Sequence, residues 1–319
     1  MRKIVLVGSG DIGSRHLQAL CKSTEETAIE IIEQNEKAIN RTKSRLDEVK
    51  FSKDKIKFKW KKTIQDCSNE SDLVIVATLA EGRAKIIKEL LEKNHTRFII
   101  EKMVCQSQSE YDMILENMNK YNARGWVNTR YRYFDFYKKI KSRLKLAPIH
   151  ISVTSSFAGL STGTIHYMDL FNWLTETDDI KLNGDMILPK ILSSKRSEKL
   201  VEFSGLINGK SEYGSISITY LPEDKIPHVV SIEGQEGYVI IDEISNKILN
   251  ASENFAHMQY QPDYISNITT KIVKDILNNN NCELPTIQDL YNSHMGLFQI
   301  FNNHLEKSGN EKRALCPIT

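Results

Sequence analysis

Close to the start of the chain, a glycine-rich string joins a short apolar run to an amphipathic segment. Residues 3–7, Lys-Ile-Val-Leu-Val, are predicted to form a buried parallel strand, and residues 12–22 are predicted to form a helix. The string between them, Gly8-Ser9-Gly10-Asp11-Ile12-Gly13, has the form G-x-G-x-x-G. In this position it predicts a Rossmann-type α/β domain, because its glycines allow a tight bend and close packing of helix on strand.

Each glycine of the string has its own expected role. Gly8 permits the tight turn, Gly10 lets the backbone approach a pyrophosphate, and Gly13 lets the helix pack closely on the strand. The free amides and the dipole at the helix N-terminus then favour phosphate groups. The alternative is a glycine-rich turn of some other α/β protein, in which the string holds no ligand.

The second predicted strand, residues 28–33, ends at Glu33. This acid lies about 20 residues beyond the last glycine, which is the distance expected of a ribose-binding carboxylate. A carboxylate there repels the 2′-phosphate of NADP, so we expect NAD as the cofactor and NADP as the less favoured one. The alternatives at this position are Gln34 and Asn35, with Lys37 and Arg41 as the residues that would accept NADP.

Strands continue to alternate with helices over the rest of the first 128 residues. Such alternation, with short loops, implies a doubly wound parallel sheet covered by helices on both faces. The further strands expected are residues 57–60 (an edge strand), 72–77, 97–100 and 125–128, and the further helices are 37–49, 83–93 and 108–121.

After about residue 147 the pattern changes to runs of strands with few helices. This favours an α+β domain built on a large, mostly antiparallel open sheet. We therefore expect a Rossmann domain over residues 1–124, a substrate-binding and oligomerisation domain over 125–311, and a tail, 312–319, that returns to the first domain. The strands expected in the second domain are residues 149–157, 199–207, 213–220, 228–233 and 238–242, and the helices are 163–174, 264–278 and 287–305.

Composition limits the partners that are compatible with the chain. The formal net charge is +2, from 43 basic and 41 acidic residues mixed along the sequence, which argues against a nucleic-acid partner. The longest apolar runs are of strand length and too short to cross a membrane. The five cysteines are scattered and none forms a C-x-x-C pair, so we expect reduced thiols, no structural metal and a cytoplasmic location.

Several short motifs, in an order that spans nearly the whole chain, resemble the Gfo/Idh/MocA oxidoreductase family (glucose–fructose oxidoreductase, inositol dehydrogenase and relatives). They are the glycine string with a trailing His16, Ala77-Thr78 at a strand end, Glu101-Lys102, and His166-Tyr167-Met168-Asp169-Leu170. The final residues, Leu-Cys-Pro-Ile-Thr, also match the usual ending of the family. The cofactor-binding residues that this resemblance and the string imply are Gly8, Ser9, Gly10, Asp11, Ile12, Gly13, Glu33, Ala77, Thr78, Glu101 and Lys102.

The resemblance implies that Lys102 and His166 are catalytic and face the nicotinamide from opposite sides of a cleft between the domains. A neutral imidazole, with an ordinary pKa of about 6.5, is suited to accept the proton of an alcohol. A lysine ammonium can stabilise negative charge on the substrate oxygen, or hold the nicotinamide ribose. Which of the two takes the proton stays open. The alternatives are a solvated strand end for Lys102 and a core histidine for His166, while Arg15 and His16 are expected to pack locally.

Three positions depart from the family pattern. Met103 stands where proline usually follows Glu-Lys, so the loop there is expected to be built differently. Thr162 stands where an aspartate often precedes the histidine by four residues, which leaves Asp169 as a candidate partner for the imidazole. Arg83 stands where a histidine is common. Some relatives that act on nucleotide-linked sugars also lack the aspartate, so Thr162 does not exclude a catalytic function.

A basic segment at the junction of the predicted domains resembles the substrate-side segment of the family. Its arginines could recognise a carboxylate or phosphate in a bidentate manner, or could equally be surface charge beside aromatic neighbours. The substrate-binding residues expected are Asn128, Arg130, Thr162 and Asp169.

Together these observations predict an NAD(P)-dependent oxidoreductase. It would transfer a hydride between a nicotinamide cofactor and a secondary hydroxyl of a sugar, cyclitol or (nucleotide-)sugar derivative, as a homodimer or homotetramer. Two alternatives remain: an NAD-dependent, non-redox glycosidase of the same family, and a catalytically silent NAD-binding sensor. The sensor remains a hypothesis because Thr162 and Met103 depart from the family pattern.

Overall fold

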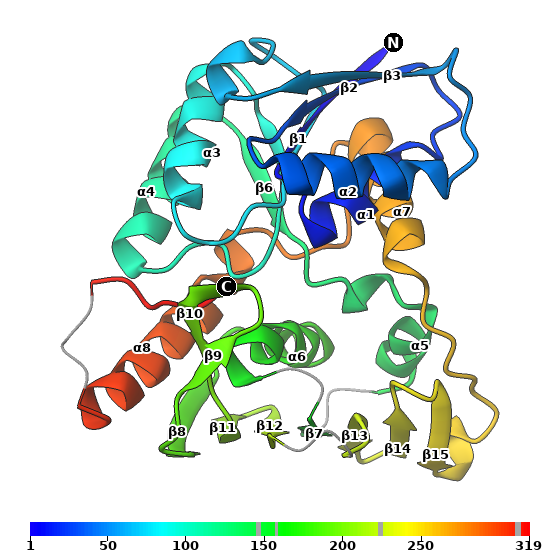
Figure 1. The fold of residues 1–319 in the computed structure, drawn as a ribbon. Coiled ribbons are helices and arrows are strands. Elements are labelled where there is room, and N and C mark those ends of the chain that lie inside the picture. The colour runs from blue at the N-terminus through cyan, green and yellow to red at the C-terminus, as the bar shows by residue number, and fades with distance from the viewer. Residues whose placement is uncertain (145–147, 157–158, 223–225, 310–313) are drawn as a thin grey trace. The chain divides into compact units, whose positions relative to one another are not determined.

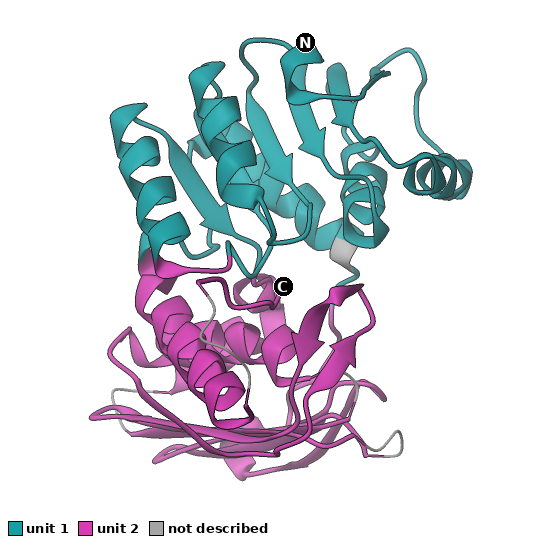
Figure 2. Ribbon diagram, turned by 60° about the vertical axis from the view of Figure 1, so that its left-hand side comes forward, with its two compact units in different colours: residues 1–105, 109–128, 263–288 teal, residues 106–108, 129–262, 289–319 magenta. Residues whose placement is uncertain are grey.

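The computed structural model describes the chain except for residues 145–147, 157–158, 223–225 and 310–313 (Figure 1). The chain divides into two compact units (Figure 2). Unit 1 consists of Met1–Cys105, Ser109–Asn128 and Asp263–Gln288, and unit 2 of Gln106–Gln108, Thr129–Pro262 and Asp289–Thr319.

Unit 1 is built on a six-stranded, fully parallel sheet with the order β3-β2-β1-β4-β5-β6. Its central strands are continuous apolar runs, and all four residues of Leu73–Val76 are buried, as expected when helices cover both faces. The predicted parallel sheet and its edge strand are confirmed. The strands are β1 (Arg2–Val7), β2 (Thr27–Ile32), β3 (Ile56–Lys61), β4 (Leu73–Val76), β5 (Arg97–Ile100) and β6 (Arg124–Val127).

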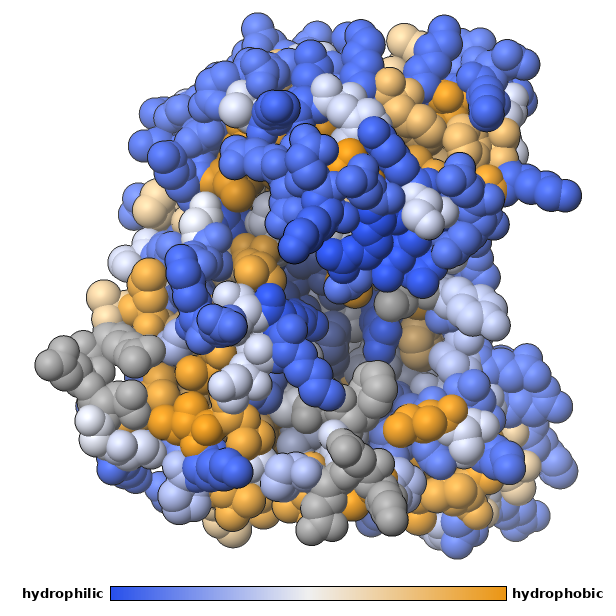
Figure 3. All heavy atoms as spheres, in the orientation of Figure 1, coloured by the Kyte–Doolittle hydropathy of each residue, from blue (hydrophilic) through white to orange (hydrophobic). Residues whose placement is uncertain are grey.

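Five helices belong to unit 1, and four of them connect its strands as predicted. The fifth, α7, comes from much later in the chain and packs beside α1, where Lys22 binds Asn267 (Figure 1). The outer face of α2 is hydrophilic, since only Ala38, Ile39 and Thr42 of that helix are buried (Figure 3). The helices are α1 (Asp11–Leu20), α2 (Glu36–Asp47), α3 (Arg83–Glu92), α4 (Gln108–Lys120) and α7 (Ile265–Asn279).

Unit 2 is built on a seven-stranded sheet with the order β15-β14-β13-β7-β12-β11-β8. All neighbouring strands are antiparallel except β7 and β12, so the predicted mostly antiparallel sheet is confirmed. The long helices α6 (Leu160–Thr175) and α8 (Tyr291–Lys307) lie on one face of this sheet (Figure 2). The strands are β7 (Ile149–Ser155), β8 (Lys181–Ile187), β11 (Gly205–Ser211), β12 (Gly214–Tyr220), β13 (Val229–Gly234), β14 (Gly237–Asp242) and β15 (Lys247–Ala251).

Four elements of unit 2 were not predicted. The strands β8 and β15 lie at the two edges of the large sheet, where most of their residues are at least partly exposed and apolar alternation is weak. The strand β9 (Leu192–Ser194) is short, and the helix α5 (Asp135–Arg143) is mostly polar or charged and buries only Phe136, Tyr137 and Ile140. Weak apolar alternation explains why the sequence did not reveal the edge strands, whereas α5 buries residues at helical spacing and was missed although that signal is present.

The single strand predicted over residues 199–207 is in fact two strands in different sheets. The first, β10 (Ser197–Glu202), pairs with β9, and the second, β11, belongs to the large sheet. The change of sheet occurs at Gly205, which has a φ of 109°, a value that glycine adopts readily and other residues rarely adopt. A Cβ there would lie 2.5 Å from the carbonyl oxygen of Met186.

The two units differ from the predicted domain limits at three places. Residues 125–128 form β6 in the parallel sheet, and residues 263–288, which include α7, also belong to unit 1. The described part of the tail belongs to unit 2, where the amide of Val201 donates to the carbonyl of Pro317. Residues 312 and 313 of the predicted tail and Phe157 of the predicted strand lie outside the described residues.

Candidate functional site

The glycine string forms the turn between β1 and α1. Gly8 has a φ of 86°, and a Cβ there would lie 3.0 Å from the backbone of Ala77 and Thr78 at the end of β4. A Cβ on Gly13 would lie only 2.0 Å from the carbonyl oxygen of Gly8. At Gly10, by contrast, nothing lies within 4 Å of the position of a Cβ. The backbone at Gly10 is therefore open to a ligand, while the other two glycines are required by packing.

Glu33 follows β2, and its carboxylate faces the glycine string. One oxygen accepts from the amide of Ser9 at 2.8 Å. The other accepts from the amides of Gln34 and Asn35, each at 2.9 Å. Of the alternatives considered for this position, Asn35 is the N-cap of α2, since its side chain accepts from the amides of Lys37 and Ala38. The carboxylate of Glu33 is thus held at the end of β2 beside the glycine string.

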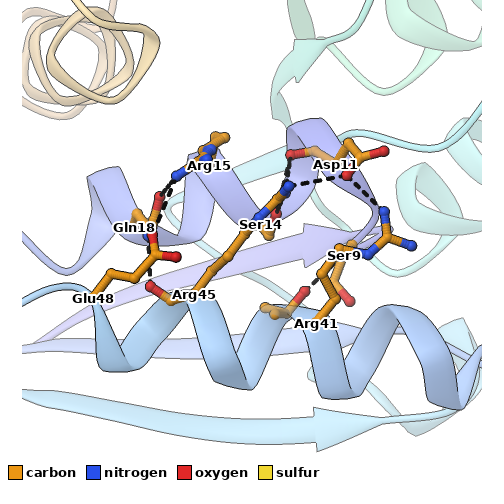
Figure 4. A network of polar contacts seen from close by, with 9 residues as sticks. Ser9, Asp11, Ser14, Arg15, Gln18, Arg41, Arg45 and Glu48 are labelled. Atoms are coloured by element: carbon orange, nitrogen blue, oxygen red, sulfur yellow. Dashed lines mark hydrogen bonds and ion pairs between the residues drawn. The ribbon is translucent and has the colours of Figure 1, made fainter.

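Two arginines of α2 reach the first turn of α1, as Figure 4 shows. Arg41 donates to the carboxylate of Asp11 at 2.6 Å, and Arg45 donates to the same oxygen at 3.1 Å. The hydrogen bond from Arg41 is the main cause that lowers the pKa of Asp11, although burial opposes it. Arg41 is therefore engaged by Asp11, which leaves it less suited to hold a 2′-phosphate.

The loop after β5 contains a second carboxylate, that of Glu101. One oxygen of Glu101 accepts from Nε2 of His16 at 2.9 Å and from the amide of Asn128 at 2.6 Å. Burial alone would raise the pKa of Glu101, but these two hydrogen bonds and the charge of Arg83 lower it to about 2. His16 also contacts the hydroxyl of Thr269, so its two side-chain partners are distant in the sequence, and the expected local packing of His16 is not what the structure shows. The side chain of Asn128 is engaged within unit 1 and is 8% exposed.

Arg83 holds the two loops that follow β4 and β5. Its guanidinium donates to the carbonyl oxygens of Thr78, Glu101 and Met103. One buried arginine therefore satisfies backbone acceptors from two strand ends at once. The Lys102–Met103 peptide bond in the second of these loops is cis.

Thr78 and Lys102 complete this edge of the parallel sheet. The hydroxyl of Thr78 is buried and has no hydrogen-bond partner among the described residues. Lys102 is only 4% exposed. An unpartnered buried hydroxyl on the loop that contacts the glycine string fits a polar ligand such as a dinucleotide, because buried polar groups are costly when left without partners. The loop residues predicted to bind a cofactor thus lie at the ends of three neighbouring strands, β1, β4 and β5.

His166 lies on α6 in unit 2. Its Nδ1 donates to the carbonyl oxygen of Thr129 at 3.0 Å. Since a carbonyl can only accept, this bond places the proton of a neutral imidazole on Nδ1 and leaves Nε2 as the basic nitrogen. Between Gly159 and Asn172 every residue is buried except Thr162 and His166, which lie one helical turn apart. We call Thr162 and His166 the accessible stripe of α6.

Asp169 is not on that stripe. It is 0% exposed, and Arg132 donates to one of its oxygens through Nε and Nη2 while the hydroxyl of Thr129 donates to the other. Burial raises the pKa of Asp169, and the charge of Arg132 opposes this. The proposed substrate contact of Asp169 is therefore wrong, because both oxygens are engaged inside unit 2. The partner of His166 is the Thr129 carbonyl rather than Asp169.

The remaining substrate candidates, Thr162 and Arg130, have polar surroundings in unit 2. The Thr162 hydroxyl donates to Glu202 at 2.6 Å. Arg130 has a φ of 63°, its guanidinium lies 5.7 Å from the centre of the Tyr131 ring, and its buried Nε has no partner among the described residues. Arg130 is thus held over the Tyr131 ring, and its Nε–H remains able to donate a hydrogen bond to a ligand.

Sequence reasoning did not find Glu202 or the carboxylate of Glu243. Glu243 accepts from the hydroxyls of Tyr131, Tyr137 and Tyr167, three residues more than 75 positions earlier in the chain. Burial raises the pKa of all three tyrosines. No local motif marks either glutamate, because their partners come from distant segments.

The described residues include no group of three or more His, Cys, Asp or Glu side chains that could hold a metal ion. Among the helices of the same residues, none combines the length and apolar character that crossing a bilayer requires. All five cysteines are free thiols.

Comparison with known proteins identifies the first unit. Residues 2–129 match the model of the Gfo/Idh/MocA family, an oxidoreductase family with an NAD-binding Rossmann fold. Residues 2–129 therefore resemble the NAD-binding Rossmann domain of this oxidoreductase family. The matched segment includes every residue predicted to bind the cofactor, from Gly8 to Lys102. No match was found among curated proteins.

Over nearly the whole chain, several solved structures have a similar fold. One is the WlbA dehydrogenase of Bordetella pertussis in complex with NADH and UDP-GlcNAcA, with a TM-score of 0.68, 14% identity and 96% of each chain covered. Another is GenD2 from gentamicin A biosynthesis in complex with NAD, with a TM-score of 0.65, 13% identity, and 98% of this chain and 95% of that one covered. A third is a putative myo-inositol dehydrogenase of Sinorhizobium meliloti 1021, with a TM-score of 0.64, 12% identity, and 94% and 95% covered.

Proposed function

We propose that this protein is an NAD-dependent dehydrogenase that oxidises a secondary hydroxyl of a sugar, cyclitol or nucleotide-sugar derivative. The observation that carries the proposal is the open backbone at Gly10, within a domain of an oxidoreductase family. The fold is shared with the WlbA dehydrogenase, which was crystallised with NADH, and with GenD2, which was crystallised with NAD.

The cofactor would be NAD rather than NADP. The amides of the first turn of α1 would receive the pyrophosphate, and Glu33 would bind the hydroxyls of the adenosine ribose. The carboxylate of Glu33 is already oriented by the Ser9 amide. A 2′-phosphate would meet this charge, while Arg41, the nearby cation considered to offset it, is engaged by Asp11.

Two side chains of the chain would carry the chemistry, Lys102 and His166. When bound, NAD would accept the hydride from the substrate carbon. The hydroxyl proton would pass to Nε2 of His166, whose Nδ1–H is fixed by the Thr129 carbonyl. The ammonium of Lys102 would donate to the substrate oxygen and stabilise the negative charge that grows there.

Substrate contacts would come from Thr162 on the accessible stripe and from Arg130. A guanidinium whose Nε has no protein partner favours a carboxylate or phosphate on the substrate. Sugars with such groups fit this requirement, and UDP-GlcNAcA is the ligand named for the WlbA structure.

We also propose that the protein is a cytoplasmic homodimer or homotetramer. The face of the unit 2 sheet opposite α6 and α8 presents a row of small hydroxyl side chains, which would let a second sheet approach closely. The row includes Ser152, Ser217 and Ser231, which are neighbours across three strands. The free thiols fit a reducing compartment. Light scattering would give the oligomeric state.

The function is tested with the variants Lys102→Ala and His166→Ala. Each should lower turnover by at least ~100-fold on an active sugar while NADH affinity, from fluorescence titration, stays within about threefold. Exposed residues of the same kind, Lys85→Ala and His257→Ala, are matched controls. Near-normal turnover in both test variants would remove the catalytic assignment. NAD that copurifies with no net NADH production would indicate the non-redox glycosidase, and NAD affinity without any turnover would indicate the sensor.

A further inference from the structure

Glu202, at the end of β10, reaches the N-terminus of α6. One of its carboxylate oxygens accepts from the amide of Ser161 at 2.6 Å, and the other accepts from the hydroxyl of Thr162 at 2.6 Å. The amide of Phe203 donates to the first oxygen at 3.0 Å, which fixes the side chain from its own strand. A Cβ on Gly159 would lie 2.0 Å from the Glu202 side chain, so only glycine leaves space for it at this helix start.

The bond from Thr162 determines what that hydroxyl can do on the accessible stripe. A hydroxyl carries one proton, and here the proton is directed to Glu202. Any group that meets the Thr162 oxygen from the accessible side must therefore donate to it. Both the hydroxyl of a sugar and the protonated imidazole of His166, one helical turn away, are donors.

We propose that Glu202 is a positioning residue that supplies, through Thr162, the carboxylate charge of the site on α6. The proposal rests on the function proposed above, because it assigns His166 a positive charge during the reaction. The negative charge of Glu202 would stabilise the imidazolium that forms when Nε2 takes the substrate proton. The aspartate that is absent at position 162 would thus be replaced by a glutamate forty residues later, from another element.

Other charged or titratable groups face His166 from the elements packed against α6. Tyr131 lies with its ring centre 6.0 Å from the imidazole, and Arg130 precedes it. The ion pair of Arg132 and Asp169 is internally balanced. From β12, the Tyr220 hydroxyl packs against Gly163, where a Cβ would lie within 2 Å of it. Glu243, which accepts from the hydroxyls of Tyr131 and Tyr167, is a further carboxylate on the Tyr131 side. Glu202 is the carboxylate that contacts Thr162 of the accessible stripe directly.

A purely structural role for Glu202 makes a different prediction. A carboxylate at a helix N-terminus stabilises the helix whether or not the site is used. Glu202→Gln keeps an oxygen for the Ser161 amide but removes the charge, so the melting temperature would fall under either role. Only the electrostatic role changes the pKa of His166.

The experiment is a pH titration of the Cε1–H signal of His166 by NMR in the full-length protein with ¹³C-labelled histidine, assigned with His166→Gln. Across one helical turn, loss of the carboxylate charge should lower the pKa of His166 in Glu202→Gln by about one unit. Glu202→Asp, which keeps the charge, should restore it to within about 0.3 unit. Glu198→Gln, which changes an exposed carboxylate on the same strand, is the control and should leave it unchanged.

A pKa of His166 that falls by less than about 0.3 unit in Glu202→Gln would overturn the proposal, as would an equal change in Glu198→Gln. If Glu202→Gln does not fold, Thr162→Val replaces it, because valine keeps the volume but removes the hydroxyl that links the Glu202 carboxylate to the accessible stripe. It should lower the pKa by about half a unit, and an unchanged value would again overturn the proposal. The titration needs neither cofactor nor substrate, so its failure is distinct from a failure of the dehydrogenase assignment.

Discussion

The carboxylate of Glu101, directly before Lys102, should contribute measurably to the stability of unit 1 in its charged form. Its Oε1 accepts hydrogen bonds from both His16 and Asn128. Glu101→Gln keeps an oxygen at this position and the volume of the side chain. The variant therefore tests the charge rather than the packing.

The size of the effect follows from the pKa of Glu101. It is lowered from 4.5 to about 2, and the side chain is 13% exposed, so solvent screens the interaction little. A depression of roughly 2.5 units corresponds to about 3 kcal/mol of stability at pH 6. Because the folded pKa is the lower one, this stability is complete above the unfolded pKa and is lost as the pH falls towards the folded value. The difference between wild type and variant should shrink to about 1.5 kcal/mol at pH 3.

Urea unfolding followed by tryptophan fluorescence measures this difference. Trp60 and Trp126 lie in unit 1 and Trp173 in unit 2, so a Trp173→Phe background limits the signal to unit 1. Glu92→Gln, which removes a half-exposed carboxylate of α3, is the control and should cost less than about 0.5 kcal/mol. A loss below about 1 kcal/mol at pH 6, or a loss that does not shrink between pH 6 and pH 3, would refute the reasoning.

Three further predictions follow from the same geometry. Gly13→Ala should destabilise unit 1 by at least about 2 kcal/mol in urea unfolding, because the added Cβ meets the Gly8 carbonyl. Gly10→Ala should be within about 1 kcal/mol of wild type in stability but should lose at least ~10-fold in NADH affinity, measured by fluorescence titration. Arg132→Ala leaves Asp169 buried and unpaired, so thermal or urea unfolding should show a loss of about 3–5 kcal/mol, much of which Asp169→Asn in the same chain should recover. Arg83→Ala removes hydrogen-bond donors to two loops, so hydrogen exchange should accelerate by at least ~10-fold in peptides that cover residues 101–104. Exchange in α4 should not change, and its protection serves as the internal control.

Much of unit 1 could be predicted from short stretches of sequence. The strand-to-helix turn at Gly8–Gly13 and the acid at Glu33 are local requirements, since a positive φ, a close backbone contact and a strand end are each determined by one or two residues. Buried runs such as β4 have no polar position, and this identifies central parallel strands without knowledge of their neighbours.

Several elements of unit 2 could not be predicted from short stretches of sequence. Its edge strands β8 and β15 lack the apolar alternation of β12, because an edge strand with exposed residues needs no buried face to form. The membership of α7 in unit 1 was equally hidden, since it depends on packing against α1 more than 240 residues earlier, as the bond from Lys22 to Asn267 illustrates.

The sequence by itself therefore determined the backbone of the nucleotide loop and the identity of the catalytic candidates, because those properties depend on residues adjacent in the chain. Only the tertiary structure decided the partners of those residues. It gave His166 the Thr129 carbonyl, buried Asp169 against Arg132, and brought Glu202 to Thr162. Hydrogen bonds and ion pairs act over a few ångströms in space and impose no regular spacing on the sequence. These partners could therefore not be predicted from a periodic pattern.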